Sequence, residues 1–189
     1  MPIGDQDDFR LLLLSGPLSV GKSSVTSVLV ATHGYTKVRS GSYVASVAST
    51  RGQPQNRRGL QEVGDSLDVE TDYLWLLNEV AKPAILAAPY KKTWVVDAVR
   101  KDRQVAHFRS EFRQAISHVH LYASEDVLRD RYERRQSAGD DYVGDTPYNV
   151  AVRHPNEIAA RSLIEIADFA IDIGERSPEE AARLIVQGL

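Results

Sequence analysis

Residues 16–23 read GPLSVGKS and directly follow the apolar run RLLLLS. This spacing fits G-x-x-x-x-G-K-S/T, the pattern of a loop that wraps phosphates. Gly16 and Gly21 permit backbone torsions that side chains would block, so successive N–H groups can point at phosphate oxygens. A helix that begins at Lys22 would direct its positive dipole end at the same anion. The stretch therefore predicts a phosphate-binding loop between a strand and a helix.

The residues of this loop have distinct expected roles toward the phosphates of a nucleotide and Mg²⁺. We expect Lys22 to bridge the outer phosphates and the Ser23 hydroxyl to ligate Mg²⁺. The predicted nucleotide-binding residues are Gly16, Ser19, Val20, Gly21, Lys22, Ser23 and Ser24. The loop by itself leaves open whether the phosphate is transferred, hydrolysed or sensed.

A second stretch with chemical potential is TWVVDAVRKD, residues 93–102. An apolar strand that ends at Asp97 places a carboxylate at the carboxyl edge of the sheet, where open α/β sheets bind ligands. Asp97 could hold a Mg²⁺-bound water or accept a proton from an attacking oxygen. Arg100 suits an anionic acceptor, because a guanidinium binds phosphate with two hydrogen bonds. The competing interpretation is an aspartate that caps the next helix and a solvated arginine.

The third stretch is LRDRYERRQSAG, residues 128–139. Helical spacing places Arg131 and Arg135 on one face, next to a segment rich in glycine and aspartate. Two arginines before a closing lid would neutralise charge on a transferring phosphoryl group. A charged, solvated helix is the alternative interpretation of the segment.

The region between Gly41 and Ala88 shows no strand pattern and is predicted to be a helical insertion. A second substrate could bind here. The candidate acceptor-binding residues are Arg39, Ser42, Arg58 and Asp65, together with Arg100. The aromatic residues Tyr73 and Trp75, with the neighbouring leucines, are predicted to pack in the core.

The elements that must position these residues follow an α/β pattern, with short apolar runs alternating with longer helical stretches. The predicted strands are Arg10–Ser15, Tyr35–Val38, Thr93–Asp97, Ser117–Tyr122 and Phe169–Ile173. Helices are expected from Lys22 to about His33, from Ser124 to Ser137, and after a capping box formed by Ser177 and Glu180. Residues 136–148 are the predicted lid loop.

Composition limits the class of protein. The 189 residues are most simply one domain, 1–189, and the formal net charge of −3 gives no general attraction to nucleic acid or membranes. The chain has no cysteine, which excludes disulfides and a cysteine nucleophile. An acidic start and a short LLLL run argue against a signal peptide or a membrane span, so a cytoplasmic protein is expected. The oligomeric state stays open.

Four stretches together resemble the nucleoside monophosphate kinase branch of P-loop proteins. They are GPLSVGKS, VVDAVR, the arginine pair Arg131 and Arg135, and IADFAIDIGERSPEEA. The likeness is greatest to dephospho-CoA kinase and the archaeal adenylate-kinase-related proteins. The stretch LQEVGDSLDVET is also similar to the acceptor-side helix of phage deoxynucleotide monophosphate kinases. Ala98 stands where relatives usually have glycine, and the D-G-F-P-R signature of adenylate kinases is absent.

The resemblance implies a P-loop NTPase three-layer fold with a five-stranded parallel sheet, a helical acceptor-binding insertion and a short lid. It implies transfer of the γ-phosphoryl group of ATP, with Mg²⁺, to a nucleoside or deoxynucleoside monophosphate. Lys22, Asp97, Arg131 and Arg135 are the expected catalytic residues, and Ser23 and Asp97 the expected metal site. Transfer to a hydroxyl acceptor, as in dephospho-CoA kinase, and a nucleotide-dependent switch without an acceptor are the alternatives.

Overall fold

The computed structural model describes residues 8–139 and 146–188. Its centre is a five-stranded sheet with the strand order β2-β3-β1-β4-β5, and every neighbouring pair is parallel. The strands are β1 (Arg10–Ser15), β2 (Thr36–Lys37), β3 (Thr93–Val96), β4 (Ile116–Tyr122) and β5 (Phe169–Asp172). The predicted α/β class and the five-stranded parallel sheet are therefore confirmed.

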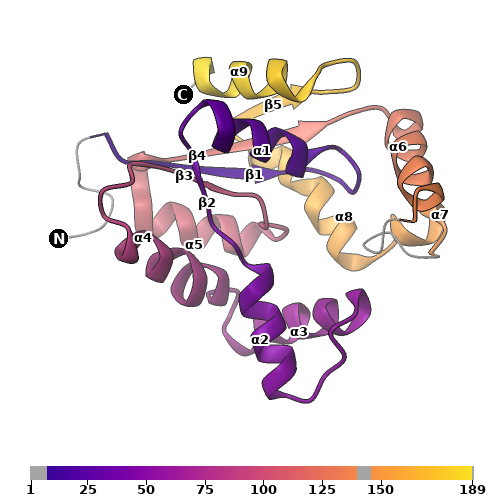
Figure 1. Cartoon of the computed structure of the whole chain (residues 1–189), viewed down its shortest axis with the longest axis horizontal. Helices are drawn as coiled ribbons and strands as arrows, with labels where there is room; N and C mark the ends of the chain where they lie inside the picture. Colours follow the sequence, from indigo (N-terminus) through magenta and orange to yellow (C-terminus); the bar gives the residue numbers. More distant parts are fainter. Residues whose placement is uncertain (1–7, 140–145, 189) are drawn as a thin grey trace.

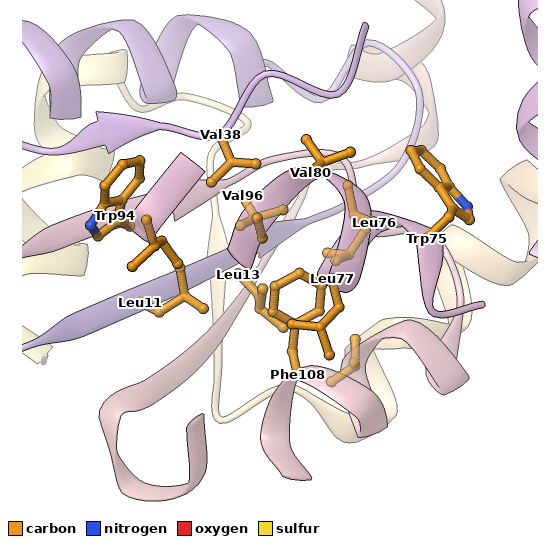
Figure 2. Close-up of a cluster of buried hydrophobic side chains, with 14 of the residues drawn as sticks. Leu11, Leu13, Val38, Trp75, Leu76, Leu77, Val80, Trp94, Val96 and Phe108 are labelled. Carbon is orange, nitrogen blue, oxygen red and sulfur yellow. The ribbon is translucent and has the colours of Figure 1, made fainter. Parts of the chain in front are cut away.

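The central strand β1 is buried on both of its faces, as its unbroken run of leucines predicts for a parallel strand. Leu11 and Leu13 pack into one cluster with Trp94, Val96 and Phe108, shown in Figure 2. The alternate residues of β1 pack into a second cluster on the opposite face. This two-sided burial fixes the sheet edge from which the phosphate loop begins.

Helices cover both faces of the sheet and complete three layers (Figure 1). The helices α1 (Lys22–Thr32) and α9 (Pro178–Gly188) pack together on one side, and α4 (Lys82–Ala87) and α5 (Asp102–Phe112) lie on the other. The capping box predicted for α9 is present: the Ser177 amide donates to Glu180 and the Glu180 amide donates to the Ser177 hydroxyl. The sequence thus predicted correctly that α1 begins at Lys22 and that α9 begins after Ser177.

The helical insertion contains no strand within residues 41–88, all of which the structure describes, and its part at residues 41–70 lies away from the sheet in Figure 1. It comprises α2 (Gly41–Thr50), α3 (Arg57–Glu70) and a π-helical segment (Leu76–Ala81) that continues into α4. Asn56 caps α3, since its side chain accepts a hydrogen bond from the Gly59 amide at 2.9 Å. Trp75 is 7% exposed and belongs to the core, as predicted, whereas Tyr73 is half-buried and lies against Arg103 instead of in the core.

Three further helices lie near the carboxyl end of the sheet: α6 (Glu125–Ser137), α7 (Tyr148–Ala151) and α8 (Pro155–Ser162). Short 3-10 turns cover Arg113–Ala115 and Leu163–Ile166. The predicted lid spans 136–148, and its residues 140–145 lie outside the described residues, so the lid stays a prediction. In the part of the chain that the structure describes, no helix combines the length and apolar character needed to cross a bilayer.

Candidate active site

The phosphate loop connects β1 to α1, as predicted, and its backbone requires glycine at two positions. Gly16 has φ +145°, and a Cβ atom there would collide with the carbonyl oxygen of Leu121 on β4. Gly21 has φ +105° and is the N-cap residue of α1. Ser19 is also left-handed, with φ +60°. These torsions form the concave backbone that directs N–H groups toward an anion at the start of a helix.

Lys22 is held against the loop itself. Its ammonium group donates hydrogen bonds to the carbonyl oxygens of Gly16 and Pro17. Burial and the nearby charge of Arg100 together lower the pKa of Lys22 to about 8, although Glu157 and Asp97 act in the opposite direction. A phosphate group would supply the negative charge that this lysine environment only partly provides.

Ser19 provides an observation that fits a phosphate ligand. Its hydroxyl oxygen is buried and finds no hydrogen-bond partner among the described residues. A buried polar atom without a hydrogen-bond partner costs folding free energy, and most buried polar atoms in proteins do have a partner. The hydroxyl lies in the loop that lines the cavity, so a phosphate oxygen is a suitable partner for it.

Asp97 and Arg100 follow β3 at the carboxyl edge of the sheet. The Asp97 carboxylate accepts a hydrogen bond from Lys37 of β2 at 2.6 Å, an ion pair in which Asp97 is only 10% exposed. The backbone amides of Arg100 and Lys101 both donate to the side-chain oxygen of Gln104. The turn that carries Arg100 is therefore fixed to the first turn of α5.

A single cavity of about 1650 Å³ joins the loop, the β3 edge and the insertion. Its described lining has ten lysines and arginines but only five carboxylates, which favours an anionic ligand. Lys22, Asp97, Arg100, Arg131 and Arg135 all line this cavity. The structure thus brings together every residue predicted to be catalytic.

Arg131 makes three hydrogen bonds to backbone carbonyl groups. It donates to Val20 in the loop at 3.0 Å, and to Ile173 and Gly174 after β5 at 2.8 and 3.1 Å. The guanidinium therefore ties α6 to the phosphate loop and to the segment after β5. This contact gives Arg131 a structural role in addition to the predicted charge-neutralising one.

Glu157 of α8 contacts the phosphate loop directly. Its carboxylate accepts the Leu18 amide at 2.7 Å and also pairs with Arg161 at 3.2 Å. Arg161 in turn reaches Glu125 at the start of α6 and the hydroxyl of Tyr148 in α7. A chain of contacts therefore runs from a loop amide to both helices that flank the predicted lid.

The residues predicted to bind the acceptor are divided between two places. Arg58 and Asp65 line the large cavity; Arg58 is 90% exposed and pairs with Glu62, and Asp65 accepts a hydrogen bond from Asn156. Arg39 and Ser42 instead line a smaller surface depression of about 440 Å³. The structure does not bring Arg39 and Ser42 to the large cavity.

Several polar side chains that line the cavity were not predicted from the sequence. Among them are Lys37, Asp68, Gln104 and Glu157. Asp68 lies three residues after Asp65 on one helix face, so helical spacing could have indicated it. His154 caps α8, since its ring nitrogen accepts the Asn156 amide at 3.2 Å.

The donor set for a metal at this site is oxygen-based. In the described residues, no group of three or more histidines and carboxylates could hold a metal ion by itself. The Ser23 hydroxyl at the start of α1 fits Mg²⁺, which usually binds through one or two protein oxygens together with phosphate oxygens.

The fold and the loop define a P-loop α/β architecture, and solved structures of kinases share this fold. A gluconokinase from Sinorhizobium meliloti 1021 is 16% identical and superposes with a TM-score of 0.53, over 97% of this chain and 93% of that chain. Shikimate kinase from Aquifex aeolicus vf5 is 16% identical, with a TM-score of 0.55 and 94% of each chain covered. A sugar kinase from Janibacter sp. HTCC2649 is 17% identical, with a TM-score of 0.54 over 95% and 93%. Such identities establish a shared fold.

The chain belongs to the AAA domain family, whose model matches residues 11–148. The matched segment begins in β1, includes the phosphate loop and ends at Tyr148. A search of curated proteins finds no match.

Proposed function

We propose that the chain is an ATP-dependent phosphotransferase that moves the γ-phosphoryl group to a nucleoside or deoxynucleoside monophosphate. The observation that carries the proposal is that Arg100 and Lys22 of the phosphate loop line one cavity. The charge of Arg100 also contributes to lowering the pKa of Lys22. Two cations in one cavity suit two phosphate groups, one from the donor and one from the acceptor.

In this proposal the loop amides, Ser19 and Lys22 bind the donor phosphates, and Arg100 binds the phosphate of the acceptor. Arg131 and Arg135 add positive charge on the α6 side of the cavity. Mg²⁺ bound with ATP would neutralise phosphate charge, held by Ser23 and, through water, by Asp97. An acceptor phosphate is already ionised, so positioning and charge neutralisation supply the rate without a strong base.

A hydroxyl acceptor is the second candidate, and Asp97 is the observation that favours it. The Asp97 carboxylate lies in the same cavity and is oriented by Lys37 at 2.6 Å, as a base that takes a proton from a hydroxyl would need to be. The structural neighbours named as gluconokinase, shikimate kinase and sugar kinase agree with a small-molecule acceptor.

The test is an acceptor screen with ATP and Mg²⁺ that follows ADP release and identifies the product by mass spectrometry. The panel holds nucleoside and deoxynucleoside monophosphates, dephospho-CoA and small sugar acids. We expect acceptor-dependent ADP release that is lost in Lys22→Ala and retained in Lys91→Ala, which changes an exposed lysine outside the cavity. Tight nucleotide binding without acceptor-dependent turnover would instead identify a switch and overturn the proposal.

A further inference from the structure

A buried carboxylate forms part of the cavity wall on the side of the insertion. Asp68 of α3 is 7% exposed. One of its oxygens, Oδ1, accepts the indole N–H of Trp75 at 2.7 Å and the side-chain amide of Gln104 at 2.9 Å. None of the hydrogen bonds within the described residues uses the other oxygen, Oδ2. The carboxylate is therefore fixed in place by one oxygen.

The environment of Asp68 does not compensate its charge. Within residues 8–139 and 146–188, no lysine or arginine forms an ion pair with it. Burial raises the pKa of Asp68, while the bonds from Trp75 and Gln104 and the more distant charge of Lys101 act against that increase. A buried carboxylate held only by neutral donors costs folding free energy, and such groups concentrate at functional sites. An asparagine would satisfy Trp75 and Gln104 equally well.

Gln104 connects Asp68 to the turn that carries Arg100. Its oxygen accepts the Arg100 and Lys101 amides at 2.9 and 3.3 Å, so its nitrogen must face Asp68. This orientation is unambiguous, because only the oxygen of a glutamine side chain can accept. The spacing between Asp68 and the Arg100 backbone is thereby fixed, and the two residues can bind opposite ends of one acceptor.

The surface around Asp68 suits a flat ring. Trp75, Val44 and Leu60 line the same cavity, and Tyr43 stacks on Trp75 with ring centres 5.9 Å apart and planes 11° apart. The stacked pair is rigid, since the indole N–H of Trp75 is also fixed by Asp68. An apolar wall beside a fixed hydrogen-bond acceptor is typical of a site for a heteroaromatic ring.

We propose, on the basis of the proposed function, that Asp68 reads the base of the acceptor and selects bases that carry an amino group. Guanine, adenine and cytosine present amino N–H donors that a carboxylate oxygen accepts. The ring N–H of uracil and thymine lies between two carbonyl oxygens, which repel a carboxylate. A site built to bond an N–H group discriminates against ligands that leave its buried group unpaired.

The test measures binding directly, without turnover. Isothermal titration calorimetry is performed with the monophosphates of guanosine, adenosine, cytidine and uridine on the wild-type protein and on Asp68→Asn. The asparagine keeps an oxygen for Trp75 and Gln104 but replaces Oδ2 with an N–H₂ group. We expect the wild type to prefer at least one amino-bearing base over uridine by about tenfold. In Asp68→Asn this preference should disappear, with uridine monophosphate binding as tightly or more tightly than in the wild type.

Asp72→Asn is the matched control, because Asp72 is an exposed aspartate outside the cavity that pairs with Arg103. It should keep the wild-type affinities within about twofold, and thermal melting should show that both variants are folded. An unchanged base preference in Asp68→Asn would overturn the inference. So would a wild-type protein that binds uridine monophosphate most tightly, or one that binds none of the four monophosphates. Selective binding without phosphoryl transfer from ATP would leave the inference standing and refute the proposed function.

Discussion

At the scale of single residues, the surroundings of the phosphate-loop lysine disfavour its charged form. Lys22 is bound by two loop carbonyl groups, and burial together with Arg100 lowers its pKa to about 8. Below this value the side chain is charged in the free protein and can attract phosphate. Above it the side chain is neutral, and binding of ATP must restore the proton at a cost in free energy.

We therefore predict that the affinity for ATP is highest below pH 8 and falls as the pH rises from 8 to 9.5. The decrease should approach tenfold for each pH unit while the bound lysine remains protonated. Calorimetric titrations across this range measure the effect. Lys22→Arg, which stays charged throughout, should bind more weakly but lose the alkaline decrease. A wild-type affinity that is constant to pH 9.5 would contradict the assigned cause.

Arg100 provides the second prediction at this scale. Arg100→Ala should raise the KM for the acceptor about tenfold or more and change the KM for ATP much less, because one charge-assisted phosphate contact is lost. Steady-state kinetics with each substrate varied in turn separate the two constants. Arg103→Ala is the control, since Arg103 lies outside the cavity and pairs with Asp72 on the surface. Equal changes in both constants would argue against an acceptor role for Arg100.

At the scale of elements, α8 brings a negative charge to the phosphate loop. The Glu157 carboxylate accepts the Leu18 amide at 2.7 Å, and its charge also raises the pKa of Lys22. A nucleotide phosphate near this loop meets a like charge and competes for the same donor. Because Glu157 pairs with Arg161, which contacts Glu125, its displacement would be transmitted to the start of α6.

Glu157→Gln is therefore expected to bind ATP several-fold more tightly than the wild type. The amide oxygen can still accept the Leu18 amide, but the repulsion of phosphate is removed, a change worth roughly 1 kcal/mol. The alkaline decrease of ATP affinity should also begin at a lower pH, because one group that raises the Lys22 pKa is lost. Calorimetry at several pH values measures both effects, with Glu165→Gln, an exposed residue outside the cavity, as the control. Weaker ATP binding would show that Glu157 assists the phosphate site.

The elements could be predicted well because their causes are local. An unbroken apolar run gave β1 its correct bounds, and the box of Ser177 and Glu180 gave the start of α9. The predicted strand Tyr35–Val38 is shorter in the structure, Thr36–Lys37, because this edge strand pairs only with β3 among the described strands. Contacts such as Lys37 with Asp97, 60 residues apart, depend on packing between elements. Sequence spacing could not indicate them.

At the scale of the whole molecule, the phosphate loop is supported by a polar cluster inside the sheet. Ser15 ends β1 immediately before the loop, and its hydroxyl lies 2.7 Å from His118 Nε2 and 2.9 Å from His120 Nδ1 on β4. All three residues are buried. The cluster connects the centre of the sheet to the first residue of the loop. Its ionisation therefore affects the stability of the whole folded molecule.

The cluster predicts a specific sensitivity to acid. Burial lowers the pKa of both histidines to about 4, assisted by Arg109 at His118 and by His118 and Lys22 at His120. As the pH falls from about 6.5 to 4, the unfolded chain takes up protons that the folded chain excludes. The free energy of unfolding should therefore decrease by up to about 3 kcal/mol for each histidine.

Urea denaturation between pH 4.5 and 7.5 measures how steeply the free energy of unfolding depends on pH. His120→Asn should make this pH dependence shallower, even if the stability at pH 7.5 is lower. His33→Asn is the control, since His33 is half-exposed at the end of α1, and it should keep the pH dependence of the wild type. Parallel pH curves for the wild type and His120→Asn would refute the assignment.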